Sequence, residues 1–144
     1  MPAPAYPTVP ARAVGWLTEA EMVEVDRVMI EDLRIELVQM MENAGRNLAR
    51  LVLDAAAPDR VAVVAGPGGN GGGGLVAARH LANSGVDVVV TLARGELTGV
   101  PAHKLDILTR RGVSTSGSLV EADVTVDALI GYSLRGAPRG RSAE

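Results

Sequence analysis

Residues 61–85 read VAVVAGPGGNGGGGLVAARHLANSG, and this stretch decides the fold class. It opens with a continuous apolar run that ends at a glycine cluster, as expected for a strand buried on both faces. Residues 75–84 then have the spacing of a helix, Gly85 is suited to stop it, and 86–92 form a second β-branched run. This order predicts one βαβ unit with a right-handed crossover.

The same alternation continues toward the end of the chain, whereas the beginning has a helical pattern. A capping box at Thr18 opens a first helix, and apolar residues spaced over 37–55 predict a longer second one. After the βαβ unit come a helix over 101–111, a short strand near Val113 and a last strand over 124–130. This alternation favours an α/β domain with an open, mostly parallel sheet covered on both faces and preceded by two N-terminal helices.

Length and composition indicate one domain and exclude several classes of partner. We expect residues 1–16 to form a flexible, proline-rich arm and residues 17–144 to form the folded domain. A net charge of −3 and a scarcity of aromatic residues do not suit a nucleic-acid surface. The chain has no cysteine, and no uncharged apolar run approaches the roughly 20 residues that cross a bilayer. We therefore expect a cytoplasmic protein without a membrane segment.

The glycine cluster, residues 66–74, is a candidate anion site. It lies between a strand end and a helix start, where free backbone N–H groups and the helix dipole favour a phosphate. Residues 66–71 fit the dinucleotide pattern G-x-G-x-x-G, but the second strand ends in Thr91-Leu92-Ala93-Arg94 and not in the acidic residue that holds a ribose. An ordinary dehydrogenase is therefore disfavoured, and a P-loop is excluded because no Gly-Lys-Ser/Thr follows. A plain tight turn is the alternative to a ligand loop.

Asp127 is the other unusual residue, because it is a carboxylate within the apolar last strand. A buried charge there needs a partner, a cation or a proton, and a structural hydrogen bond to a neighbouring loop is the alternative. The strand's carboxyl end would face the same crevice as the glycine cluster, so Asn70 and Asp127 are candidate oxygen ligands for one hard cation. Residues 131–140 follow with Arg135 and Arg139 and suit either a pyrophosphate or a solvated surface.

Three segments together resemble the YjeF N-terminal domain family, whose enzymes are NAD(P)H-hydrate epimerases. They are MMENAGRNLA at 40–49, AGPGGNGGGGLVAARHLANSG at 65–85 and VDALIGYSLRGAPRG at 126–140. The resemblance spans roughly residues 17–144 and implies a Rossmann-like three-layer αβα sandwich. It also implies that hydrated NADH or NADPH is the substrate, that its R and S forms are interconverted, and that the family domain continues past residue 144.

The same resemblance implies the site residues. Asn70 and Asp127 match ligands of a potassium ion. The substrate-binding positions that it implies are Gly69, Asn70, Gly71, Gly72, Gly73, Gly131, Tyr132, Ser133, Leu134, Arg135, Gly136 and Ala137. It identifies no general acid or base. The family loop usually reads G-P-G-N-N-G-G-D-G, whereas this chain has Gly69 for the first asparagine and Gly73 for the aspartate.

These departures leave two functions open. One is the epimerase, and the alternative is a non-catalytic nucleotide-binding or protein-interaction scaffold domain of the same family. A conventional NAD(P)-dependent oxidoreductase is a third, weaker hypothesis. The resemblance and the apolar leading helices also predict a homodimer packed through the N-terminal region. His80 and His103 have no partner at ligand spacing, so we expect each to be a surface or packing residue.

Overall fold

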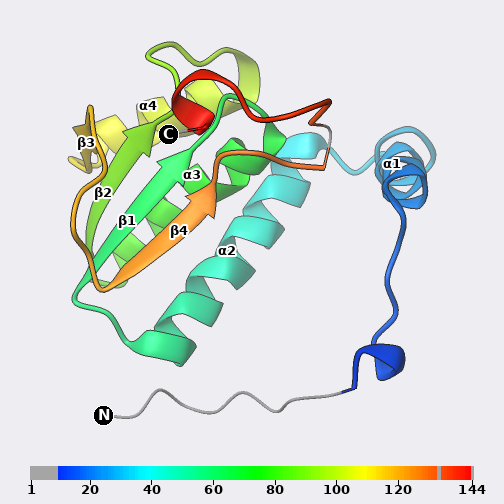
Figure 1. Ribbon diagram of the computed structural model, residues 1–144, viewed down its shortest axis with the longest axis horizontal. Helices are drawn as coiled ribbons and strands as arrows, with labels where there is room; N and C mark the ends of the chain where they lie inside the picture. The colour runs from blue at the N-terminus through cyan, green and yellow to red at the C-terminus, as the bar shows by residue number, and fades with distance from the viewer. Residues whose placement is uncertain (1–9, 133, 144) are drawn as a thin grey trace.

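A sheet of parallel strands forms the centre of the computed structural model, which describes residues 10–132 and 134–143. Its four strands lie in the order β3-β2-β1-β4 (Figure 1). Their bounds are Arg60–Ala65 for β1, Asp87–Leu92 for β2, Ser114–Ser116 for β3 and Val124–Ala128 for β4. Every neighbouring pair is parallel, which confirms the predicted Rossmann-like α/β class.

Helices precede the sheet and connect its strands. Helix α1 (Glu19–Arg27) continues into a π-helical turn, η2 (Val28–Asp32), before the long α2 (Leu37–Ala56). Helix α3 (Gly69–Asn83) joins β1 to β2, and α4 (Gly99–Arg110) joins β2 to β3. Single 3-10 turns, η1 (Ala11–Ala13) and η3 (Gly140–Ser142), lie near the two ends of the described chain. No helix among the described residues is long and apolar enough to cross a bilayer.

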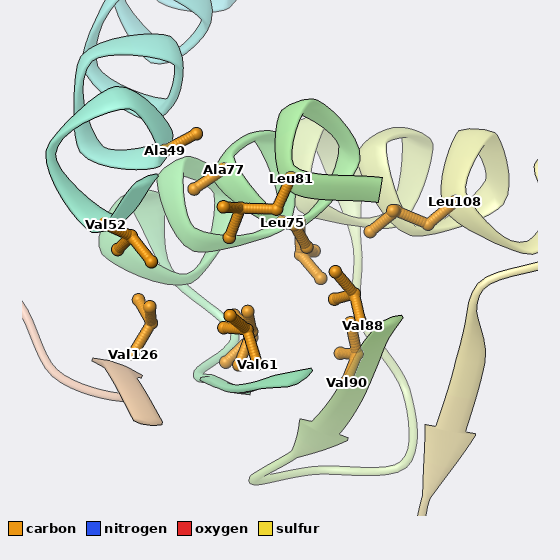
Figure 2. Packing of buried hydrophobic residues seen from close by; sticks show 13 residues of the cluster. Ala49, Val52, Val61, Leu75, Ala77, Leu81, Val88, Val90, Leu108 and Val126 are labelled. Atoms are coloured by element: carbon orange, nitrogen blue, oxygen red, sulfur yellow. The ribbon is translucent and has the colours of Figure 1, made fainter. Parts of the chain in front are cut away.

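The core lies between the sheet and one layer of helices. Figure 2 shows side chains from α2, α3 and α4 meeting those of β1, β2 and β4 on one face of the sheet. Leu75, Leu81 and Leu108 are almost completely buried there, and burial of each such side chain contributes about 1.5–3 kcal/mol. The core is aliphatic throughout, in keeping with the absence of phenylalanine.

On the other face of the sheet, among the described residues, a loop segment and not an α-helix lies against the strands. Alternate strand residues, among them Val64, Thr91 and Thr125, point to this side and line a cavity with residues 117–119. Thr91 Oγ1 donates a hydrogen bond of 3.0 Å to the backbone oxygen of Ser118, which holds that segment in place. Within the described residues, helices thus cover one face, so this part of the chain contributes two of the three expected layers.

The predicted starts and ends of two elements need correction. Helix α3 begins at Gly69 and not at 75, so most of the glycine cluster is helical. Tertiary contact outweighs the poor helix propensity of glycine there, because α3 packs directly on the sheet. Strand β4 ends at Ala128 and not at 130, because the Asp127 carboxylate accepts a hydrogen bond of 3.0 Å from the Leu129 N–H and turns the chain.

Helix α1 lies at the edge of the molecule (Figure 1). Its predicted capping box is confirmed, since Thr18 Oγ1 accepts from the Glu21 N–H at 3.3 Å and the Glu21 carboxylate accepts from the Thr18 N–H at 2.7 Å. None of the residues in α1 is buried. The helix therefore gains little from apolar packing on the sheet, and its local contacts hold its shape.

Candidate functional site

The turns after β1 and β4 lie directly against each other. The Gly66 N–H donates to the Ala128 oxygen at 3.0 Å, and a Cβ on Gly66 would lie only 1.9 Å from the Leu129 oxygen. Asn70 closes the junction, because its Nδ2 donates to the Ile130 oxygen at 3.0 Å. The contacts join segments about 60 residues apart at the point where the chain switches from one side of β1 to the other. Ligands of open α/β sheets bind at such switch points.

One cavity, called here the arginine cavity, opens above the carboxyl ends of β1, β2 and β4. Its volume is about 690 Å³, within the usual range for a small-molecule site. Arg94, Arg135 and Arg139 line it, no acidic residue does so among the described residues, and Gly68 at the N-terminus of α3 contributes to the wall. Three guanidinium groups beside a helix N-terminus suit a phosphate or pyrophosphate.

A second cavity, called here the methionine cavity, lies on the other side of the same junction. Its volume is about 440 Å³, and α1, α2, α3 and the end of β4 all contribute to its wall. The large apolar residues that line it are Met22, Leu37, Met40, Met41 and Leu48. The polar residues that line it are Asp26, Asn70, Asp127 and Tyr132. Gly131 lines both cavities, so the two cavities are adjacent at this residue.

Asp127 is exposed, so the prediction that this carboxylate is buried is wrong. Strand β4 is at the edge of the described sheet, and the Asp127 side chain lies on the face away from the helices. The residue lines the methionine cavity and also the cavity of about 590 Å³ on that other face. Asn70 and Asp127 therefore both line the methionine cavity, although the Asp127 side chain points to the opposite face of the sheet, and a cation held by both side chains stays a prediction.

Tyr132 joins the methionine cavity to helix α1. Its hydroxyl donates a hydrogen bond to Oδ2 of Asp26, which lies 106 residues earlier in the chain. This bond, followed by burial and by the negative charges of Asp26 and Glu19, raises the pKa of Tyr132 above its usual value. The phenol is therefore protonated at neutral pH. Asp26 was not predicted from the sequence, because no local pattern links it to the loop after β4.

An ion cluster around Glu42 was also missed. The Glu42 carboxylate, on α2, accepts hydrogen bonds from Arg79 on α3 and from Lys104 on α4, the latter at 2.5 Å. His80 Nε2 lies 3.6 Å from the same carboxylate, and this partly buried histidine packs at the cluster, in keeping with the predicted surface or packing role. Burial acts to raise the pKa of Glu42, but the bond from Lys104 and the charges of Arg79, Lys104 and His80 outweigh it and lower the pKa. With Lys104 only 4% exposed, the cluster ties three helices together.

The predicted substrate-binding residues fall into distinct groups. Gly69, Asn70, Gly73 and Tyr132 line the methionine cavity, Leu134, Arg135 and Ala137 line the arginine cavity, and Gly131 lines both. Gly71 and Gly72 are buried and line neither of these cavities. Gly136 adopts a positive φ of 78° in the turn of the loop and lines neither cavity. Ser133 lies outside the described residues.

Comparison with known proteins shows the family and supports the fold. The sequence matches the family described as YjeF-related protein N-terminus over residues 37–144. The chain belongs to this family. As a YjeF-related domain, it is similar in structure to the crystal structure of yeast ynu0, with a TM-score of 0.74 and 25% sequence identity, over 88% of this chain and 60% of that one.

Curated relatives of this YjeF-related domain carry names that refer to hydrated NAD(P)H. A protein of Dehalogenimonas lykanthroporepellens named NAD(P)H-hydrate epimerase is 47% identical over 96% of this chain and 60% of its own length. A protein of Hyperthermus butylicus named bifunctional NAD(P)H-hydrate repair enzyme Nnr is 42% identical over 85% of this chain and 25% of its own length. The chain thus spans about 60% or less of the length of these relatives.

Both glycines that depart from the family pattern have free space around them. A Cβ on Gly73 would meet nothing within 4 Å, and one on Gly69 would meet only the Met41 Cε at 3.7 Å. By contrast, a Cβ on Gly71 would lie 1.8 Å from the Gly66 oxygen. The open positions border the methionine cavity, so their lack of side chains enlarges it.

Proposed function

We propose that this domain binds hydrated NADH or NADPH and interconverts its R and S forms. The observation that carries the proposal is that the arginine and methionine cavities both border Gly131, beside the N-terminus of α3. One cavity offers guanidinium groups for a pyrophosphate, and the other offers apolar walls with a few polar groups for a ring. The names of the curated relatives support the choice of ligand.

The chemistry requires inversion at the carbon beside the ring nitrogen. Reversible loss of the hydroxyl group, or opening of the ring, needs a positioned acid or base. Tyr132, which holds its proton at neutral pH, and the carboxylates of Asp26 and Asp127 are the titratable groups that line the methionine cavity among the described residues. Arg135 and Arg139 would meanwhile hold the pyrophosphate and fix the ring relative to these groups.

A potassium ion fits the polar end of the methionine cavity. Asn70 is oriented by its Nδ2 bond to the Ile130 oxygen, which leaves the amide oxygen available as a ligand. Asp127 lines the same cavity from the edge strand β4, and amide, carboxylate and carbonyl oxygens are the donors that hard cations prefer. The ion would supply positive charge that fixes the loop and substrate oxygens. We expect potassium chloride to raise the melting temperature of the wild type relative to lithium chloride, and to have no such effect on Asp127→Ala.

We also propose that two copies associate through the N-terminal region. Trp16 is 79% exposed, Leu33 62% and Leu17 53%, so apolar side chains before and after α1 lack cover in the single chain. An exposed apolar surface of this kind is typical of a subunit interface.

The activity is tested by chromatography of the R and S hydrates. We expect the purified chain to exchange them faster than the spontaneous reaction, and Asp127→Ala to slow that exchange. If the chain binds ADP-ribose but leaves the exchange rate unchanged, the epimerase proposal is overturned in favour of the non-catalytic nucleotide-binding domain. If it neither binds nor accelerates, the dinucleotide site itself is wrong.

A further inference from the structure

The two cavities differ sharply in charge. Three arginines and no acidic residue line the arginine cavity among the described residues. The charged residues that line the methionine cavity in the same part of the chain are Asp26 and Asp127, and no lysine or arginine is among them. A ligand that spans both would therefore meet positive charge at one end and negative charge at the other. Complementary charges of this kind select a ligand that is anionic in its middle and cationic at its ring.

We propose that the methionine cavity is a subsite for a positively charged, nitrogen-containing ring, and that Asp26 and Tyr132 determine this specificity. The inference rests on the proposed function, since it assumes that a dinucleotide occupies the arginine cavity. In this proposal, helix α1 contacts the ring end of the ligand. From the sequence, this part of the chain was expected only to form a dimer interface.

Asp26 is the carboxylate best placed for this role. If Asn70 and Asp127 hold a cation, the charge of Asp127 is neutralised and Asp26 is the remaining free negative charge in the cavity. The Tyr132 hydroxyl occupies one acceptor position of the Asp26 carboxylate, which has about four, so the others can face a ring. Met22, on the same helix, adds a thioether to the wall, and thioethers make favourable contacts with ring edges.

The Asp26–Tyr132 bond also fixes where α1 sits. No residue of α1 is buried, so apolar packing alone does not hold the helix against the cavity. Figure 1 shows the segment after β4 running toward α1, and the bond from Tyr132 joins them. Tyr132 is thus a positioning residue for Asp26.

A cationic ring is also what the proposed reaction forms. When the C–O bond beside the ring nitrogen breaks, the hydroxyl leaves with a proton from an acid as water, and the nitrogen lone pair forms a C=N bond. The resulting iminium carries one positive charge until water adds to the other face and returns the proton. A carboxylate already in place stabilises the positively charged iminium more than it stabilises the neutral substrate. This difference lowers the activation barrier.

Calorimetric titration of the whole chain in potassium buffer tests the inference with three probes. ADP-ribose has the pyrophosphate without the ring, NADH has a neutral ring and NAD⁺ has a cationic one. We expect Asp26→Asn to weaken NAD⁺ binding about tenfold, to change NADH binding less than NAD⁺ binding, and to leave ADP-ribose unchanged. Tyr132→Phe should weaken NAD⁺ to a smaller extent. Asp106→Asn, a surface carboxylate on α4 paired with Arg110, is the matched control and should change none of the three.

The outcomes separate the two proposals. If the wild type binds ADP-ribose and Asp26→Asn weakens all three probes equally, or weakens none, the charged-ring subsite is wrong while the dinucleotide site stands. If the wild type binds neither ADP-ribose nor NAD⁺, both proposals are overturned. Circular dichroism of Asp26→Asn distinguishes lost binding from lost folding, and Tyr132→Phe provides the second variant if Asp26→Asn does not fold.

Discussion

Gly71 and Gly73 are two residues apart in helix α3, yet adding a methyl group to each should change stability in opposite directions. At Gly71, a Cβ would lie 1.8 Å from the Gly66 oxygen, 2.7 Å from its carbonyl carbon and 2.9 Å from its nitrogen. These are backbone atoms, so no side-chain rotation relieves the contact. Gly66 cannot retreat, because it lies against the Leu129 oxygen and donates to Ala128. We expect Gly71→Ala to cost about 3 kcal/mol or more, the upper end for an overpacked interior.

At Gly73, the same methyl group would meet nothing within 4 Å. The residue is inside a helix and is not among the glycines with positive φ, so alanine fits its backbone. Alanine has the higher helix propensity and reduces the entropy of the unfolded chain, so Gly73→Ala should stabilise the domain by about 0.5–1 kcal/mol. The two variants should therefore differ by roughly 4 kcal/mol in the free energy of unfolding, from the sum of these two effects.

Urea unfolding followed by circular dichroism measures this difference. With a slope of about 2 kcal/mol per molar urea, the two midpoints should lie about 2 M apart, with the wild type between them and nearer to Gly73→Ala. Equal midpoints for the two variants would refute the reasoning, because they would mean that α3 does not approach β1 and β4 as closely as the structure places it.

Three other predictions concern charge and association. Glu42→Gln should lower stability by about 1–3 kcal/mol, less than for a fully buried pair because the Glu42 side chain is 34% exposed. The pKa of Glu42 is lowered from 4.5, so its contribution to the free energy of unfolding is complete above pH 4.5 and is lost as the pH falls through the lowered pKa. The urea midpoints of Glu42→Gln and wild type should therefore converge in acid. Because the pKa of Tyr132 is raised from 10, the contribution of this residue to the free energy of unfolding is complete below pH 10 and is lost as the pH rises through the raised pKa. Ultraviolet titration should show a late tyrosinate step that Tyr132→Phe removes and Asp26→Asn moves to lower pH. Leu33→Glu should convert the proposed dimer to monomer by light scattering, and a wild type that is already monomeric at micromolar concentration would contradict the dimer.

The sequence contains enough information to predict the βαβ unit but not the position of every strand. Runs such as 61–65 and 86–92 identify buried strands because their apolar residues are continuous. Whether β4 is central or at an edge depends on pairing between distant segments, in this case β1 with β4. The expectation of a buried Asp127 failed for that reason. Val64, which pairs with Asp127 in the central strand β1, is buried, whereas Asp127 is exposed in the edge strand β4.

The candidate site was predictable where it depends on the backbone and unpredictable where it depends on distant side chains. The carboxyl ends of neighbouring parallel strands share one edge, so the turns after β1 and β4 could be placed together from the sequence. The bond between Asp26 and Tyr132 and the cluster at Glu42 depend on how helices pack against one another. Spacing within a single helix carries no information about such pairs, which are separated by 106 residues in one case and 62 in the other.

Helix α2 connects the stability of the domain to the shape of its candidate site. Met40 and Met41 line the methionine cavity, and the next residue, Glu42, is held by Arg79 and Lys104 from α3 and α4. Close contact between α2 and α3 at Gly45, where a Cβ would lie 2.5 Å from Val76, fixes the distance between the two helices. Any loss of the Glu42 cluster therefore acts on the wall of the cavity as well as on unfolding. Ring binding should consequently weaken in Glu42→Gln even though Glu42 itself lines neither cavity.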